Sequence, residues 1–244
     1  MPDRALLGTE IHYVSESGDL VETTLAAVDA ELVVRGRPVR GFPTYAGQAN
    51  YPGLFWSATT GSHVGYESLL ERDRLWVADF DPRVTWIAGQ PFWFKGGDGG
   101  CPRRHVPDFL LRLSDEGFLV VDVKPERMLA KPAVAEVLEW TGRLCAVRGW
   151  GYEVWSGADP AVMENIKFLA VGRRRQFLDE EVLAVVATVG RSGMTVTAVE
   201  SLVAGRPRGL VRAAVFSLLW SGRWSTDLSL PLSDTSVLWC GDTA

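Results

Sequence analysis

Histidine is scarce in this chain of 244 residues. The three histidines show no spacing typical of a metal site: His12, His63 and His105. A serine–histidine–aspartate triad is therefore poorly supplied, and the run Gly190-Arg191-Ser192-Gly193 lacks the GxSxG spacing of a nucleophile elbow. Any chemistry is expected to depend on carboxylates and lysine instead.

Cysteine is equally scarce, and long apolar runs are missing. Cys101, Cys145 and Cys240 are odd in number and far apart, which predicts neither a disulfide framework nor a CxxC zinc pair and favours a reducing cytoplasmic location. No apolar run approaches the roughly 18 residues of a membrane span, and the start of the chain does not resemble a signal peptide. No membrane partner is expected.

The chain also has no excess of positive charge. It carries 25 Lys and Arg against 30 Asp and Glu, a net charge of -5. This balance mildly disfavours nucleic-acid binding without excluding it, because binding depends on local patches of charge. With 47% hydrophobic and 23% charged residues, the composition is that of a globular protein, and the length allows one large domain or two ordinary ones.

The pattern of apolar residues predicts a mixed α/β fold. Residues 1–60 alternate short apolar runs such as Leu32–Val34 with Gly and Pro, which predicts strands and turns. Further along, the pattern predicts helix 66–80, stopped by Pro82, then strand 84–94, a turn at 96–100, strands 105–113 and 118–124, helix 133–148 and strand 152–155. The three middle strands are expected to form a meander.

From about residue 179 the pattern becomes helical. One helix is predicted through Val182–Val189, a second capped by Thr195 and a third opened by Pro207, followed by a hairpin around Pro231. This order suggests a winged-helix-like domain of the kind used on DNA, or a small packing or docking domain. The expected domains are thus 1–176, with 1–60 as a β-rich extension, and 177–244.

The strands at 105–113 and 118–124 bring candidate catalytic residues together. Because side chains alternate between the faces of a strand, Asp122 and Lys124 share a face, and a hairpin can place Asp108 beside Asp122. Two neighbouring carboxylates repel each other, and a hard cation such as Mg²⁺ relieves that repulsion. A protonated Lys124 could stabilise a pentavalent phosphate or orient the attacking water.

The preceding helix offers Glu67 and Glu71 as a further acidic ligand on one face. An isolated Asp at a strand end or an exposed Glu pair is usually only solvated. The whole set is more specific: a helix Glu, then Pro107-Asp108, thirteen residues, and Asp122-Val123-Lys124. This order matches a PD-(D/E)xK nuclease core.

A family resemblance covers about residues 60–175. Its motifs resemble the N-terminal nuclease domain of TnsA-like heteromeric transposase endonuclease subunits: Ser68-Leu69-Leu70-Glu71, Asp79-Phe80-Asp81-Pro82-Arg83-Val84, Gln90-Pro91-Phe92, His105-Val106-Pro107-Asp108-Phe109 and Val120-Val121-Asp122-Val123-Lys124-Pro125. The resemblance implies a restriction-endonuclease-like fold, Mg²⁺ dependence with Mn²⁺ as a substitute, and cleavage of one strand at transposon ends. It implies as partners DNA, a TnsB-like DDE transposase for the other strand, and an AAA+ regulator.

Carried over by position, the resemblance favours Glu71 over Glu67 as the helix carboxylate. It makes Asp108 and Asp122 metal ligands, Lys124 the catalytic lysine and the Val123 carbonyl an extra ligand. The family often has Gln or Glu at position 122, so the shorter Asp122 is a departure that could shift the metal geometry.

Other candidates carry weaker signals. Gly96–Gly100 is expected to be a hairpin tip rather than a phosphate loop, because no Lys-Ser/Thr follows it. His105 could contact phosphate or simply be a polar strand residue. The candidate DNA-contacting side chains are basic and lie at the domain junction or near the third C-terminal helix: Arg173, Arg174, Arg175, Arg206, Arg208 and Arg212.

Three functional hypotheses follow. The first is a metal-dependent DNA endonuclease subunit of a heteromeric transposase. The second is a non-catalytic DNA-binding or assembly protein with a degenerate nuclease site, and the third is a stand-alone restriction or repair nuclease, because a fold alone does not define biology.

Overall fold

The structure is a computed structural model that describes residues 5–41, 51–174, 176 and 178–241. Helices and strands are mixed along the chain, which confirms the α/β class. The strands are β1 Glu10–Val14, β2 Leu20–Thr24, β3 Gly53–Ser57, β4 Ser62–Tyr66, β5 Val84–Gly89, β6 Trp93–Asp98, β7 Cys101–His105, β8 Phe109–Leu113, β9 Phe118–Val123, β10 Gly151–Trp155, β11 Trp224–Ser225 and β12 Trp239–Cys240. The helices are η1 Leu6–Gly8, α1 Ala30–Arg35, α2 Leu69–Phe80, α3 Glu126–Leu129, α4 Pro132–Arg148, α5 Pro160–Leu169, η2 Ala170–Arg173, α6 Glu180–Val189, α7 Val196–Leu202 and α8 Arg208–Trp220.

The chain divides into two compact units. The first comprises Met1–Asp79 and Arg83–Gly157, and the second comprises Phe80–Pro82 and Ala158–Ala244. The division thus falls after Gly157 and not between residues 176 and 177, because η2 packs tightly on α8. Gly172 of η2 approaches α8 so closely that a Cβ atom there would lie 2.4 Å from the main-chain nitrogen of Ser217.

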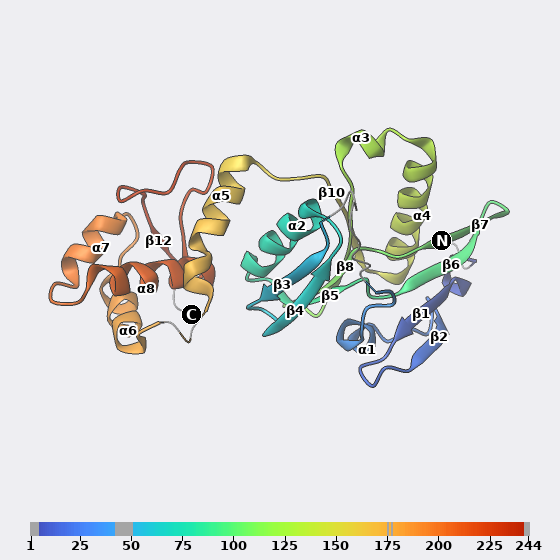
Figure 1. The fold of residues 1–244 in the computed structure, drawn as a ribbon, viewed down its shortest axis with the longest axis horizontal. Coiled ribbons are helices and arrows are strands. Elements are labelled where there is room, and N and C mark those ends of the chain that lie inside the picture. Colours follow the sequence, from blue (N-terminus) through green and yellow to red (C-terminus); the bar gives the residue numbers. More distant parts are fainter. Residues whose placement is uncertain (1–4, 42–50, 175, 177, 242–244) are drawn as a thin grey trace. The chain divides into compact units, whose positions relative to one another are not determined.

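The central sheet of the first unit has the strand order β10-β9-β8-β5. Strands β5, β8 and β9 pair antiparallel in the order of the predicted meander, but they are not consecutive, because β6 and β7 lie between β5 and β8 in the chain. Strand β10 pairs parallel to β9 after a crossover through α3 and α4. Figure 1 shows α2 and α4 beside this sheet. Phe109 and Val121 pack with Leu75 of α2, whereas Leu110 and Val120 belong to the cluster with Leu144 of α4, so the helices cover opposite faces.

Two of the expected strands are in fact divided. The segment 84–94 forms β5 and β6, which belong to different sheets, because the chain turns at Gln90 and Pro91. The segment 105–113 is divided between β7 and β8 at Val106–Asp108, where Pro107 has no N–H group for a ladder. Strands β6 and β7 form a hairpin whose tip is Gly99-Gly100, both with positive φ, as a type I′-like turn requires.

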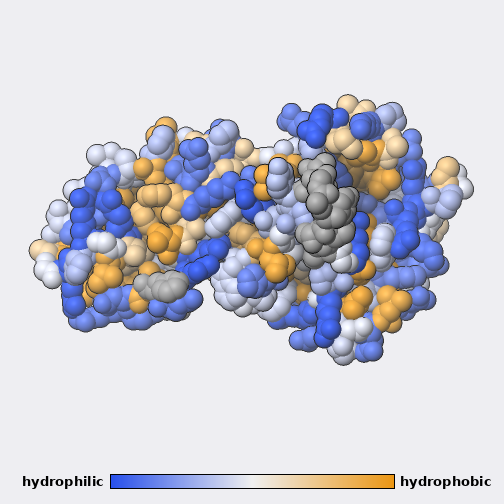
Figure 2. Space-filling view, viewed as in Figure 1, coloured by the Kyte–Doolittle hydropathy of each residue, from blue (hydrophilic) through white to orange (hydrophobic). Residues whose placement is uncertain are grey.

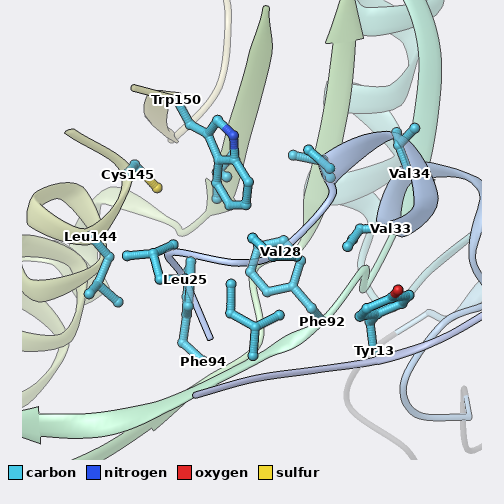
Figure 3. Close-up of a cluster of buried hydrophobic side chains, with 14 of the residues drawn as sticks. Tyr13, Leu25, Val28, Val33, Val34, Phe92, Phe94, Leu144, Cys145 and Trp150 are labelled. Atoms are coloured by element: carbon cyan, nitrogen blue, oxygen red, sulfur yellow. The ribbon is translucent and has the colours of Figure 1, made fainter. Parts of the chain in front are cut away.

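The N-terminal segment contains the expected strands and also a helix that the sequence did not predict. The run Leu32–Val34 lies in α1 and not in a strand, because Asp29 caps the helix by accepting a hydrogen bond from the Glu31 N–H group. Strands β2, β1, β6 and β7 form a second sheet. Figure 3 shows the core beneath it, where Phe92 lies between Leu144 of α4 and Val33 of α1.

The second unit is built around α8. Thr195 caps α7 by accepting from the Ala198 N–H group, as predicted, and Pro207 precedes α8. Every residue from Ala214 to Trp220 is buried, so only the first turns of α8 reach the surface. The predicted hairpin is much shorter than expected, being limited to β11 and β12. On the face seen in Figure 2, hydrophobic patches of this unit are interspersed with hydrophilic residues.

None of the helices in the described parts of the chain is both long and apolar enough to cross a membrane. Cys101, Cys145 and Cys240 all lie in described segments and are free thiols, in agreement with the expected lack of disulfides.

Candidate active site

Adjacent strand ends bring Asp108 and Asp122 together. Phe109 of β8 pairs with Val121 of β9, so Asp108 and Asp122 are the next pair across the ladder. The Asp108 N–H group donates to the Val121 carbonyl at 3.0 Å, which extends this pairing by one residue. The two carboxylates thus lie side by side, as the alternation of faces predicts.

Lys124 lies against both carboxylates. Its Nζ is 2.9 Å from Asp108 Oδ2 and 4.0 Å from Asp122 Oδ1, and it donates to the Val123 carbonyl at 3.1 Å. Burial by itself would lower the pKa of Lys124, but the charges of Asp108, Asp122 and Glu71 outweigh it and raise the pKa above the usual value. Lys124 therefore carries a positive charge at neutral pH.

Asp108 is held by main-chain and side-chain donors. Its Oδ2 accepts the Val123 N–H group at 2.7 Å as well as the Lys124 amine. Burial and the neighbouring Asp122 charge raise the pKa of Asp108, although Lys124 opposes that shift. Both recorded bonds end on Oδ2, which leaves Oδ1 without a hydrogen bond from the described residues.

Asp122 is completely buried and is fixed by two side chains from other strands. His105 Nε2 lies 2.8 Å from Oδ1 and 2.9 Å from Oδ2, and the Tyr152 hydroxyl donates to Oδ2 at 2.7 Å. Burial and the Asp122 charge raise the pKa of Tyr152, so its hydroxyl remains a donor. They also raise the pKa of Cys145, which keeps this buried thiol protonated.

Tyr152 is a member of this cluster that the sequence analysis missed. The sequence predicted that Tyr152 lies in strand 152–155, but it did not predict which strand of the sheet pairs with that strand. The parallel pairing of β10 with β9 puts Tyr152 beside Val120. Val120 lies two residues before Asp122, on the same face of β9.

Glu71 lies at the start of α2 in a capping arrangement. Its Oε2 accepts the Glu67 N–H group at 2.8 Å, its Oε1 accepts the Ser68 hydroxyl at 2.9 Å, and Ser68 Oγ accepts the Glu71 N–H group at 3.2 Å. Ser68 and Glu71 therefore form a variant of the capping box, which explains why α2 begins at Leu69 and not at the expected Tyr66. Glu67 instead pairs with Arg40 at 2.9 Å.

The electrostatics connect Glu71 with the aspartates. Burial, followed by the Asp108 charge, raises the pKa of Glu71 from 4.5 to about 7. In an unfolded chain the group would ionise at its usual pKa. Ionisation in the folded protein therefore opposes folding, and this penalty develops as the pH rises from about 4.5 to 7.

A pH-dependent stability difference is expected for Glu71→Gln in protein kept free of metal by EDTA. Between pH 5 and pH 8 the variant should gain about 2–3 kcal/mol in unfolding free energy relative to wild type, because glutamine cannot ionise. Urea unfolding at several pH values measures this gain. Glu139→Gln, at an exposed position of α4, is the control and should show no such trend. A parallel pH profile for Glu71→Gln and wild type would contradict the assigned pKa.

The donor set fits a hard divalent cation. Asp108 Oδ1 is left unused, Asp122 oxygens retain lone pairs beside their hydrogen bonds, and the Val123 carbonyl faces the Lys124 amine. Among the described residues, however, no three His, Cys, Asp or Glu side chains are gathered to hold an ion by themselves. Water and a phosphate oxygen would have to complete the coordination, as is usual for Mg²⁺.

Two predicted DNA-contacting arginines belong to an ion-pair network. Arg208 lies 2.7 Å from Glu200 and 2.7 Å from Asp234, and Arg212 lies 2.7 Å and 2.5 Å from the same two carboxylates. We call these four residues the α7–α8 ion-pair network. It ties α7, the first turns of α8 and the segment before β12 together.

The remaining predicted DNA-contacting arginines that the structure describes lie in different environments. Arg206 pairs with Glu181, Arg173 is half-buried beside an aromatic ring of α8, and Arg174 is exposed. Arg175 lies outside the described residues. Their contact with DNA stays a prediction.

Comparison of the chain with models of known protein families gave no match. A search of the curated proteins gave no match either.

Proposed function

We propose that this chain is a metal-dependent DNA endonuclease of the PD-(D/E)xK type. The observation that carries the proposal is the cluster of Asp108, Asp122 and Lys124 at the ends of β8 and β9, with Nζ 2.9 Å and 4.0 Å from the two carboxylates. Paired carboxylates beside a charged lysine suit a site that receives a cation and a phosphate together.

The arrangement of elements supports the proposal. A helix that carries Glu71 precedes the three antiparallel strands β5, β8 and β9, and a crossover helix leads to a parallel fourth strand, which is the order expected of a restriction-endonuclease-like core. In the second unit, Thr195, which lies between α6 and α7, forms an isolated β-bridge with Val237. The β11–β12 pair follows α8. Both features support a winged-helix-like domain. The burial of most of α8 leaves only its first turns for a partner.

In the proposed reaction Asp108, Asp122 and the Val123 carbonyl would hold Mg²⁺, which would supply Lewis-acid activation of the phosphate. A water oxygen bonds to phosphorus and releases a proton to solvent, while the bond from phosphorus to the leaving strand oxygen breaks and that oxygen takes up a proton from solvent. Lys124 donates hydrogen bonds to the charge that develops on the phosphate oxygens. His105 and Tyr152 keep the Asp122 carboxylate in place.

The biological setting is proposed from the motif resemblance. A TnsA-like subunit would cut one strand at each transposon end, and a TnsB-like DDE transposase would cut the other, under an AAA+ regulator. Substantial cutting by the isolated chain would instead favour a stand-alone restriction or repair nuclease.

A non-catalytic DNA-binding or assembly role is the second candidate. The observation that favours it is the complete burial of Asp122, whose two oxygens already accept hydrogen bonds from His105 and Tyr152. A site closed in this way would bind DNA or a protein without needing a cation.

Calorimetric titration of Mn²⁺ separates these roles. Wild type is expected to bind Mn²⁺, and the Asp108→Ala, Asp122→Ala double variant should lose that binding, because both carboxylates are gone. The matched control is Asp115→Ala, in the β8–β9 turn, which should bind as wild type does. Failure of wild type to bind at millimolar Mn²⁺, also when a DNA duplex supplies the phosphate oxygen, would speak for the non-catalytic role.

A further inference from the structure

Gln90 stands in the same row as the two aspartates. Gly89, the last residue of β5, pairs with Phe109, so Gln90 is opposite Asp108. The Gln90 N–H group donates to the Asp108 carbonyl at 2.9 Å. Gln90, Asp108 and Asp122 therefore follow one another across the adjoining ends of β5, β8 and β9.

The backbone of Gln90 is strained. Its φ is +45°, a region that L-residues with a side chain adopt at a cost. Among the described residues only Glu116 is another non-glycine with positive φ, and Glu116 lies in the tight turn between β8 and β9. No tight turn of that kind accounts for Gln90, because the chain passes there from one sheet into the next.

The side chain of Gln90 is buried without a partner. Only 2% of the residue is exposed, and neither Oε1 nor Nε2 has a hydrogen bond within the described part of the chain. Burying an amide without hydrogen bonds destabilises the folded state, and such groups in native structures call for an explanation. An apolar side chain of similar length would avoid this cost.

The chemistry of the amide indicates what it binds. A phosphate oxygen or a metal ion could satisfy only one of its two polar atoms, since the first only accepts and the second takes only lone pairs. A water molecule can donate to Oε1 and accept from Nε2 at the same time. Water is also the nucleophile of the proposed hydrolysis.

From this combination we infer that Gln90 binds and orients the attacking water beside Asp108 in the metal-bound protein. The inference rests on the proposed nuclease function and adds a residue that touches a reacting molecule. Strain and burial then have a common cause, because they keep a neutral donor–acceptor side chain buried on a residue whose main chain is bonded to Asp108.

The first test is the stability of the metal-free protein. Gln90→Met keeps the length and the backbone strain but removes the amide. Its melting temperature in EDTA should be about 2–4 °C above that of wild type, because the unpartnered polar group is gone. Leu111→Met, a buried apolar exchange in β8, is the matched control and should not rise. A lower melting temperature for Gln90→Met would show that the amide has a structural partner and would overturn the inference.

The second test follows the amide itself by nuclear magnetic resonance. The chain has only three Gln and two Asn residues, so the Gln90 side-chain pair can be assigned by its disappearance in Gln90→Met. Adding Mg²⁺ should shift this pair and give it a cross-peak to water. The Asn165 pair, bonded to the Leu228 and Leu230 carbonyls, should not move.

The outcomes are distinct. Mg²⁺ binding by calorimetry with an unmoved Gln90 signal would overturn the role of Gln90 alone. A water cross-peak that does not respond to Mg²⁺ would identify a structural water and would also overturn it. Failure of wild type to bind the metal even with a DNA duplex present to supply the phosphate oxygen would overturn the proposed function and the role of Gln90 with it.

Discussion

Lys124→Ala is expected to lower the rate of metal-dependent DNA cleavage by about two to three orders of magnitude, the usual loss when one donor to a developing oxyanion is removed. Lys124 is charged because the carboxylates around it raise its pKa. Its amine lies beside Asp108, where a phosphate bound to the same cation would be placed. The measurement is the single-turnover cleavage rate with the full chain and a TnsB-like transposase, the proposed partner.

The variant must still fold for this result to be informative. Removing Lys124 leaves Asp108 and Asp122 without their positive neighbour, so unfolding should be followed in the presence of Mg²⁺, which can replace the missing charge. Lys131→Ala, at the exposed N-cap of α4, is the control and should cleave at the wild-type rate. Cleavage by Lys124→Ala at the wild-type rate would rule out the proposed mechanism.

Gly172→Val should destabilise the second unit by about 3 kcal/mol, at the upper end of the usual cost of overpacking. A Cβ atom at this position would lie 2.4 Å from the Ser217 nitrogen and 2.5 Å from the Phe216 carbonyl carbon. These are main-chain atoms of a buried helix and cannot move aside as a flexible side chain would. The measurement is urea unfolding followed by tryptophan fluorescence, since Trp220 and Trp224 are buried in this unit.

Gly209→Ala is the matched control in α8 itself. A Cβ atom there would have no neighbour within 4 Å. This exchange should stabilise the protein by about 0.5–1 kcal/mol, because alanine favours a helix over glycine. Equal effects of the two variants would show that η2 does not pack on α8 as the structure has it.

The local elements that carry the site were predictable from the sequence. Alternation along residues 118–124 places Asp122 and Lys124 on one face, and a short turn returns the chain to Asp108. The end of α2 was given by Pro82. These features depend on neighbours a few residues away, so a single sequence contains the necessary information.

The rest depended on tertiary contacts. Residues 84–94 form two strands and not one, because β6 pairs in the second sheet while β5 stays in the central sheet, and the chain changes direction at Gln90. Tyr152 reaches Asp122 only because β10 lies parallel to β9 after the α4 crossover. The unpartnered amide of Gln90 is a property of burial, and no pattern in the sequence reports it. The packing of η2 against α8 likewise depends on contacts between residues far apart in the sequence, so the sequence pattern did not predict it.

The α7–α8 ion-pair network determines how DNA binding by the second unit would respond to salt. A free arginine that neutralises a phosphate displaces condensed counterions, and affinity then falls steeply with ionic strength. Arg208 and Arg212 already neutralise Glu200 and Asp234, so a phosphate must first take them from those carboxylates. Salt weakens the internal pairs and the new ones together. DNA bound through this surface would therefore show a shallow salt dependence, with selectivity governed by the fit of the partner more than by its charge.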